Sequence, residues 1–323
     1  MNNDLLRYRS LLADELNETT ELMLQSIKTF PSAIQEPIRK LITGGGKRLR
    51  PALVILSAHI CGSKSDKVTI VAAAVEMLHT ATLVHDDLID RAETRRGQQT
   101  LNRQLVPAAT VLTGDALFAV AAKLASRSQN PVIVRRFAET LETICVGEIG
   151  QMFRDKSKPP SFEIYYERIF AKTASLFALC TESGALLAGC PSEKVRQSGR
   201  FGRLMGEAFQ IADDVLDIVG EETKLGKPTV ADLRQGLLTL PVLYYYRAHP
   251  DDERVRETLT NHLSEQSITA LAADIKNSNA PHQAMQQAER HIEEAGQLLT
   301  QYPDSVYRQA MEEIAAFAAR RRF

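Results

Sequence analysis

The sequence predicts one all-α domain of about a dozen helices, covering residues 1–323. Apolar residues recur at helical spacing along nearly the whole chain. No run shows convincing alternation of apolar and polar residues with turn signals on both sides, so no strand is expected. The loops are short, and no linker separates two compositions, which favours a single helical domain.

The composition is that of an ordinary soluble globular protein, with 44% hydrophobic and 24% charged residues. The net charge of −1 gives no reason to expect nucleic-acid binding. No signal peptide and no run of about 18 uncharged apolar residues is present, so we expect a cytoplasmic protein without an integral membrane segment. The four cysteines form no CxxC pair and are expected to be small buried hydrophobes in a reducing compartment.

In the first half of the chain, a glycine run at Gly44–Gly46 ends the second predicted helix, and Pro51 begins the third. A polar loop is expected from Thr94 to Arg103. The predicted helices cover residues 3–29, 34–42, 51–61, 66–90 and 107–126, the last interrupted near Gly114.

In the second half, Ser161 is expected to cap a helix with its side chain, and Gly189–Pro191 ends that helix. A loop rich in Gly, Lys and acids is expected at residues 220–232, followed by four or five shorter helices. The longer predicted helices cover residues 131–153, 161–188 and 193–219.

The stretch HTATLVHDDLIDRAETRR contains three carboxylates within five residues, at the end of an apolar helix. A helix turns about 100° per residue, so Asp86 and Asp90 share one face and repel each other. A divalent cation such as Mg²⁺ prefers all-oxygen sites of this kind. Alone, the cluster is as consistent with a solvated helix end as with a metal site.

A second copy of the pattern, Asp213–Asp217, again ends a long apolar helix. Two such clusters are difficult to explain as solvated surface. If their helices lie near each other, the carboxylates repel across a poorly hydrated space, and Mg²⁺ bridged by a diphosphate would relieve that repulsion.

Several cations flank the two motifs, and together they indicate a site for two diphosphates. Lys47 and Arg50 follow the glycine run and open a helix, an arrangement suited to phosphate oxygens. Lys172 lies within an apolar helix, where a buried lysine is costly unless it meets an anion. Singly, a solvated turn, a snorkelling side chain or a loop hinge would explain most of these residues.

The motifs GGGKRLRP, HDDLIDRAETRRG, GEIGQ, AKTASLF and GEAFQIADDVLDIVGEETKLGKPTVADL, in this order, resemble those of trans-prenyl diphosphate synthases. The resemblance runs from about Gly44 to Pro241. It implies an isoprenoid-synthase bundle around a central cavity, a homodimer, and Mg²⁺-dependent head-to-tail condensation of isopentenyl diphosphate with an allylic diphosphate.

The resemblance also implies roles for individual residues, with three Mg²⁺ per active site. The metal ligands would be Asp86 and Asp90 on one side of the allylic diphosphate and Asp213 on the other, supported by Asp87, Asp214 and Asp217. The allylic diphosphate would be held by Arg95, Lys172 and Lys227, with Thr173 and Gln210 lining the reacting region. Isopentenyl diphosphate would be held by Lys47, Arg50, His79 and Arg96.

The product length would depend on the helix before the first motif, along which the growing chain runs. Ala81 leaves the tunnel open where a Phe or Tyr would block it, so we expect a hexaprenyl to decaprenyl product of the kind used for quinone side chains. The predicted tunnel residues are Ala74, Met77, Leu78, Ala81 and Thr82, with a more distant floor at Phe118, Leu124 or Phe153. Ordinary close helix packing is the alternative explanation for this alanine-rich stretch.

Other functions stay open at this point: a shorter-chain (farnesyl or geranylgeranyl) synthase, a regulatory subunit of a heteromeric synthase, a terpene cyclase on the same fold, or a helical scaffold. The intact second motif and the isopentenyl-binding set argue against a cyclase, and whole acidic motifs argue against a regulatory subunit. One departure from the family pattern is Leu237, where many members have a lysine that contacts the allylic diphosphate.

Overall fold

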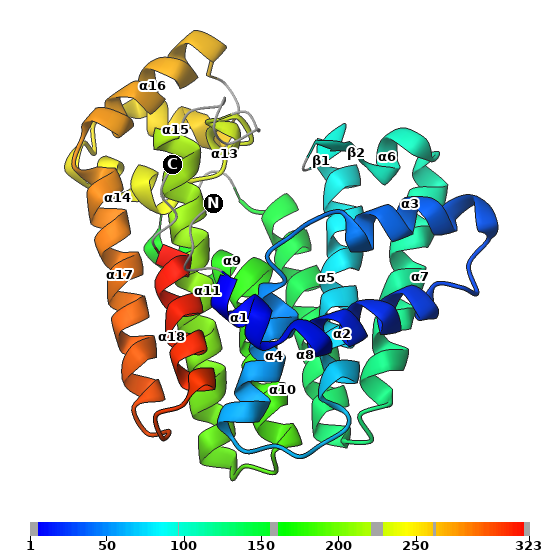
Figure 1. Ribbon diagram of the computed structural model, residues 1–323. Helices are drawn as coiled ribbons and strands as arrows, with labels where there is room; N and C mark the ends of the chain where they lie inside the picture. Colours follow the sequence, from blue (N-terminus) through cyan, green and yellow to red (C-terminus); the bar gives the residue numbers. More distant parts are fainter. Residues whose placement is uncertain (1–5, 96, 156–160, 221–228, 261–262, 320–323) are drawn as a thin grey trace. The chain divides into compact units, whose positions relative to one another are not determined.

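The computed structural model describes residues 6–95, 97–155, 161–220, 229–260 and 263–319 (Figure 1). These residues are helical apart from short loops and one two-stranded hairpin, which confirms the all-α class. The chain divides into two compact units. The first comprises Met1–Leu141, Leu176–Gly199 and Gln301–Ile314, and the second comprises Glu142–Ser175, Arg200–Thr300 and Ala315–Phe323. The single domain expected from the sequence stays a prediction.

The first unit is built around α5, a 22-residue helix that packs against α2, α4 and α7 (Figure 1). Because α5 is apolar on nearly every side, its flanking helices bury it almost completely. The helices of this unit are α1 (Leu6–Leu11), α2 (Ala13–Ser26), α3 (Ser32–Thr43), α4 (Leu49–Ile60), α5 (Val68–Ile89), α6 (Leu101–Gln104) and α7 (Pro107–Ser126). Parts of α8 (Pro131–Met152) and α10 (Ser175–Leu187) also belong to it.

Three details of the first unit differ from the sequence prediction. The first predicted helix is broken at Leu12 into α1 and α2. The predicted interruption of α7 is wrong: Gly114 lies within a continuous helix, where an added Cβ would lie 2.3 Å from Nε2 of His85. Glycine is therefore present for a close approach to α5, not for a break. The polar loop after α5 contains a hairpin, β1 (Thr94–Arg95) with β2 (Gln98–Gln99), followed by α6.

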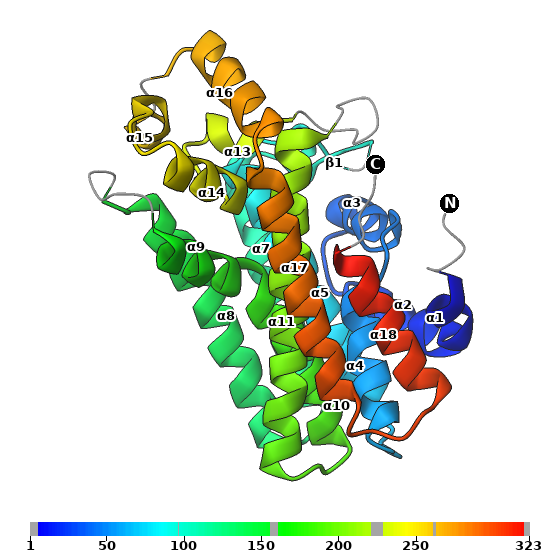
Figure 2. The same ribbon diagram turned by 90° about the vertical axis from the view of Figure 1, so that its left-hand side faces the viewer.

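The second unit has its own apolar core, in which residues of α9, α11, α14, α16 and α17 meet. Ion pairs from Glu207 to His291 and from Arg200 to Glu294 join α11 and α17, which lie side by side (Figure 2). The elements are the end of α8, α9 (Phe162–Ile169), η2 (Phe170–Ala174), most of α11 (Ser192–Val219), α13 (Ala231–Arg234), α14 (Leu240–Ala248), α15 (Glu253–Thr260), α16 (Glu265–Asn277), α17 (Ala280–Leu299) and the end of α18 (Val306–Ala319).

The helix predicted from Ser161 onward runs through α9, η2 and α10, but its centre is π-helical. Ser161 occupies the N-cap position, yet the predicted side-chain cap is wrong, because its Oγ donates to Glu163 Oε2 (3.2 Å). The loop expected at residues 220–232 is shorter at its end, since α13 begins at Ala231; residues 221–228 lie outside the described part.

Two of the described helices, α5 and α7, are long and apolar enough to cross a membrane by length and composition alone. The most apolar stretch of α5 is 78% buried inside the protein, as expected for the core helix of a globular unit. The corresponding stretch of α7 is 39% buried, which leaves an apolar face exposed.

Candidate active site

The first acidic motif occupies the C-terminal end of α5, where the helix dipole is negative and the last turn holds no basic residue. Its three acids differ in exposure: Asp86 is half-buried, Asp90 is exposed and Asp87 is buried. Carboxylates at this end of a helix are unfavourable without nearby positive charge. The motif therefore provides a place where a cation is stabilised.

Arg95 supplies part of that charge from the hairpin that follows α5. Its Nε donates to Asp87 Oδ1 at 2.7 Å, and its side chain is 33% exposed. Burial raises the pKa of Asp87, and the guanidinium of Arg95 acts in the opposite direction. The hairpin thus brings Arg95 to the acidic motif, whereas Arg96 lies outside the described residues.

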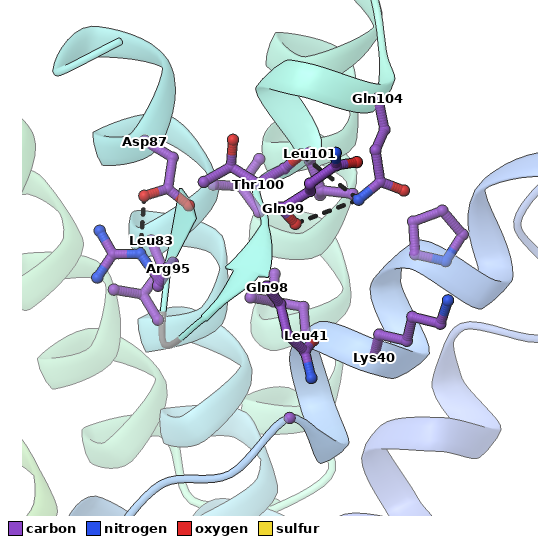
Figure 3. A pocket seen from close by; sticks show the side chains of 13 residues that line it. Lys40, Leu41, Leu83, Asp87, Arg95, Gln98, Gln99, Thr100, Leu101 and Gln104 are labelled. Carbon is purple, nitrogen blue, oxygen red and sulfur yellow. Dashed lines mark hydrogen bonds and ion pairs between the residues drawn. The ribbon is translucent and has the colours of Figure 1, made fainter. Parts of the chain in front are cut away.

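A pocket of about 410 Å³ lies beside this ion pair, between α3, α5, the hairpin and α6 (Figure 3). Its lining is mixed, with polar Lys40 and Gln98 and apolar Leu41 and Leu83. Figure 3 shows Asp87 at the wall of this pocket, joined to Arg95. The pair is thus accessible from a cavity in the first unit.

The predicted isopentenyl-binding residues of the described part all lie in the first unit. Lys47 is in the loop before α4, and Arg50 is in the first turn of that helix, its guanidinium 4.8 Å from the centre of the Phe177 ring. His79 is half-buried on α5, two turns before Asp86. Lys47 and Arg50 therefore lie before and within α4, which packs against α5, and His79 lies on α5 itself.

The second acidic motif lies in the last turns of α11, in the second unit. Asp213 is half-buried, whereas Asp214 and Asp217 are buried. The carboxylate of Asp217 accepts the backbone N–H groups of Ala231 and Asp232, each at 3.2 Å, at the start of α13. Asp217 thus fixes the chain that follows the motif.

Asp214 is held by two neutral donors. The hydroxyl of Tyr165 donates to Oδ2 and the amide of Gln210 donates to Oδ1, both at 2.8 Å. Gln210 Oε1 in turn accepts from the hydroxyl of Thr173 at 2.8 Å. One chain of hydrogen bonds therefore runs from η2 through α11 to α9, formed by Thr173, Gln210, Asp214 and Tyr165.

Burial raises the pKa of Asp214 to about 7, and the negative charge of Asp232 acts in the same direction. Burial also raises the pKa of Tyr165 well above its ordinary value, and the charge of Asp214 raises it further. Tyr165 therefore remains a donor over the whole working pH range. The bond between these two side chains survives either protonation state of the acid.

Lys172 projects from the π-helical turn η2, the kind of local irregularity that is frequent at functional sites. Its Nζ lies 2.9 Å from Glu148 Oε1, and its side chain is 42% exposed. The buried environment expected for Lys172 is therefore wrong, and its partner in the structure is a carboxylate of α8. An added Cβ on Gly147 would lie 2.5 Å from Cβ of Ala171, so glycine permits the close approach of α8 that brings Glu148 to Lys172.

Among the described residues, no group of three or more His, Cys, Asp or Glu side chains is assembled to hold a metal ion by itself. The half-buried or exposed acids Asp86, Asp90 and Asp213 nevertheless have the hard oxygen donors that suit Mg²⁺. This ion commonly binds through one or two carboxylates and completes its shell with water and substrate phosphate oxygens. The residues present fit that pattern.

The sequence interpretation missed Tyr165 and Glu148. Tyr165 lies two helical turns before Lys172, which places both residues on one side of the helix if it is regular. Glu148 belongs to the GEIGQ motif, whose contribution had no assigned residue. Neither partner follows from spacing alone, because each contact joins two helices.

Comparison with known proteins gives consistent results. Residues 31–275 match the family described as Polyprenyl synthetase. The chain is 35% identical to heptaprenyl diphosphate synthase component 2 of Geobacillus stearothermophilus, over 97% of both chains. It is 30% identical to octaprenyl diphosphate synthase of Escherichia coli, over 98% of this chain and 99% of that protein. The crystal structure of a polyprenyl synthase from Caulobacter crescentus CB15, complexed with calcium and isoprenyl diphosphate, superimposes with a TM-score of 0.91 at 33% identity and covers 99% of this chain and 98% of that one.

Proposed function

The chain belongs to the polyprenyl synthetase family and is a prenyltransferase, and we propose that it joins isopentenyl diphosphate head to tail to an allylic diphosphate, giving a long-chain all-trans polyprenyl diphosphate. The observation that carries this proposal is the pair of acidic motifs, each with a carboxylate partly open to solvent and a neighbouring acid fixed by protein donors. Such an arrangement presents oxygen ligands in a fixed direction.

Asp86, Asp90 and Asp213 are the proposed Mg²⁺ ligands, and the family resemblance assigns three ions to the site. Bound Mg²⁺ would supply positive charge against the diphosphate of the leaving group. The buried acids of the two motifs accept hydrogen bonds from the protein and would orient these ligands instead of binding metal directly. They are Asp87, Asp214 and Asp217.

Arg95, Lys172 and Lys227 are the proposed partners of the allylic diphosphate; Lys227 lies outside the described residues. Arg95 is bound to Asp87 through Nε, so a diphosphate would be held by its two terminal amino groups. Lys172 would exchange its contact with Glu148 for a phosphate oxygen. These fixed charges favour ionisation of the C–O bond to an allylic carbocation.

The remaining steps are assigned to the second substrate and to the polar residues near Lys172. Lys47, Arg50, His79 and Arg96 are proposed to hold isopentenyl diphosphate, whose double bond attacks the carbocation. Thr173 and Gln210 form a fixed polar edge of the reacting region. No side chain is assigned as the base; the departed diphosphate is the proposed proton acceptor. Apolar walls would exclude water that otherwise quenches the cation.

The long product is proposed from the residues before the first motif. Ala74, Met77, Leu78 and Ala81 are fully buried, and Thr82 is half-buried on the same helix. A Phe at position 81 would have to displace buried neighbours, so Thr82→Phe is the less disruptive substitution for blocking the proposed tunnel. A shorter product from Thr82→Phe supports the tunnel, and an unchanged product length from a folded, active variant refutes it.

A homodimer is proposed from exposed apolar side chains. In the first unit Val106 and Leu112, at the start of α7, are each 67% exposed. In the second unit Val146 and Ile149, on α8, are 60% and 54% exposed. Apolar surface of this extent is typical of an interface between subunits. Leu112→Asp should lower the mass measured by light scattering to that of the single chain.

The deciding experiment is incubation of the purified chain with labelled isopentenyl diphosphate, farnesyl diphosphate and Mg²⁺, followed by sizing of the product. A polyprenyl diphosphate of thirty to fifty carbons is expected. Because farnesyl diphosphate already has fifteen carbons, a product that stops at twenty carbons would favour the short-chain alternative. A cytoplasmic location is proposed with this activity.

A second candidate follows from the relative named heptaprenyl diphosphate synthase component 2, a name that indicates a further component in that enzyme. On this alternative, the chain needs a second, different subunit to make its product. Absence of product from the purified chain, together with product formation after addition of a partner from the same cell extract, would favour it.

A further inference from the structure

The loop between α3 and α4 has an unusual backbone. Gly45 has φ of +80° and Gly46 of +157°, and the non-glycine residue Arg48 has φ of +50°. A non-glycine residue in the left-handed region is strained, so surrounding contacts must hold it there. One such contact is the ion pair from Arg48 Nη1 to Glu76 Oε1 on α5, at 2.8 Å.

Two consecutive residues of α1 hold two consecutive carbonyl groups of this loop. The hydroxyl of Tyr8 donates to the carbonyl oxygen of Lys47, and Arg9 Nη2 donates to the carbonyl oxygen of Gly46 at 2.6 Å. Tyr8 is 1% exposed, and burial raises the pKa of its hydroxyl, so this donor stays protonated.

These two carbonyls belong to the two peptide units that flank the Cα atom of Lys47. When both peptide planes are fixed, the direction of the Cα–Cβ bond between them is fixed as well. The side chain of Lys47 therefore leaves the loop in a direction set by α1. Three residues later, Arg50 lies in the first turn of α4, which directly follows this anchored segment.

We propose that α1 is a clamp on the loop that binds isopentenyl diphosphate, with Tyr8 and Arg9 as positioning residues that aim Lys47 at the diphosphate. This inference rests on the proposed function, since it takes Lys47 and Arg50 as ligands of that substrate. The clamp lowers the entropy cost of binding, because the loop is ordered before the substrate arrives.

The test compares two arginines of the same short helix. Arg9 contacts the loop, whereas Arg7 makes an exposed ion pair with Glu313 and is 79% exposed. Loss of one charged hydrogen bond predicts a KM for isopentenyl diphosphate about five- to tenfold higher in Arg9→Ala. The KM for the allylic diphosphate should stay within about twofold, and Arg7→Ala should behave as wild type.

Tyr8→Phe removes only a hydroxyl and should raise the same KM, and Arg9→Lys, which keeps a charged donor, should restore part of the loss. Amide hydrogen exchange across residues 44–48 should rise in Arg9→Ala and Tyr8→Phe but not in Arg7→Ala. Thermal unfolding of each variant separates loss of the clamp from loss of the fold.

The possible failures are distinguishable. If Lys47→Ala leaves the KM for isopentenyl diphosphate unchanged, the substrate assignment of the proposed function is wrong. If Lys47→Ala raises this KM but Arg9→Ala matches Arg7→Ala in both KM and exchange, the assignment stands and the clamp is overturned. Equal rises in both KM values for Arg9→Ala would also overturn it.

Discussion

The two acidic motifs have the same DDxxD pattern, but the structure stabilises their buried acids in different ways. In the first unit, Asp87 is paired with the charged guanidinium of Arg95, which comes from a short hairpin. In the second, Asp214 receives hydrogen bonds from two neutral donors, Tyr165 and Gln210, on long packed helices. Identical spacing therefore does not imply an identical environment.

The two ways of stabilising the buried acids should respond differently when a diphosphate binds. Arg95 is a proposed ligand of the allylic diphosphate, so the support of the first motif is linked electrostatically to substrate. Among the residues that the structure describes, the side chains that donate to Asp214 are neutral, and their hydrogen bonds need not change when a diphosphate binds. The first motif is thus expected to respond to charge, and the second to the geometry of its hydrogen-bond chain.

The largest expected effect concerns what the motifs share. Asp86→Asn and Asp213→Asn should each lower turnover by about 10³-fold, because each removes a charged oxygen ligand from a metal-dependent step. The matched control is Asp66→Asn, an exposed acid next to the other end of α5, which should leave turnover unchanged. A steady-state assay with saturating Mg²⁺ measures all three. Near-normal turnover in either motif variant would remove that motif from the reaction.

The hydrogen-bond chain of the second motif is tested by Tyr165→Phe, which removes one donor to Asp214. Turnover should fall about tenfold and the Mg²⁺ concentration for half-maximal rate should rise, because a loosened acid orients Asp213 less well. Tyr166→Phe is the matched control, since this neighbour packs against the His291 ring instead. Equal behaviour of the two variants would mean that the bond from Tyr165 to Asp214 contributes only to folding.

Removal of charge from each buried acid tests the difference between the motifs directly. Asp87→Asn leaves Arg95 without its carboxylate partner and should lower the free energy of unfolding by about 1–2 kcal/mol. Asp214→Asn keeps groups able to bond with Tyr165 and Gln210 and removes a buried carboxyl whose ionisation costs stability, so the free energy of unfolding should not fall at neutral pH. Urea unfolding of the metal-free chain gives both values, and equal losses would contradict the comparison.

Much of the fold could be predicted from the sequence, because α5 is a long, nearly continuous apolar stretch and burial of one face of α11 gives its residues a helical period. The exceptions are local. The hairpin at Thr94–Gln99 is too short to produce an alternating pattern, and the break at Leu12 lies within a continuous apolar stripe. The π-helical turn around Lys172 changes hydrogen bonding without changing composition.

The part of the candidate site that lies on single helices could be predicted from local spacing. Asp86, Asp90 and Asp213 follow from their positions on helix faces, and Gln210 lies one turn before Asp214. The contacts of Tyr165 with Asp214 and of Glu148 with Lys172 join helices distant in sequence, so they require the packed structure. Exposure of Lys172 was missed for the same reason.

The second motif is also expected to make the stability of the chain depend on pH. Burial and the charge of Asp232 raise the pKa of Asp214 from 3.8 to about 7 in the folded chain. A carboxyl with a raised folded-state pKa binds more protons in the folded state than in the unfolded state over this window. Its contribution to stability is therefore complete below about pH 4 and is lost as the pH rises toward 7.

The difference in unfolding free energy between the wild type and Asp214→Asn isolates this contribution from all other titrating groups. Measured in the metal-free chain, the wild type should lose stability relative to Asp214→Asn between about pH 4 and pH 7, and the difference should be constant below that range. A difference that does not change with pH would show that Asp214 is ionised at its ordinary pKa. The second motif would then need a cation in contact with Asp214, as the first has Arg95, and the contrast between the two motifs would disappear.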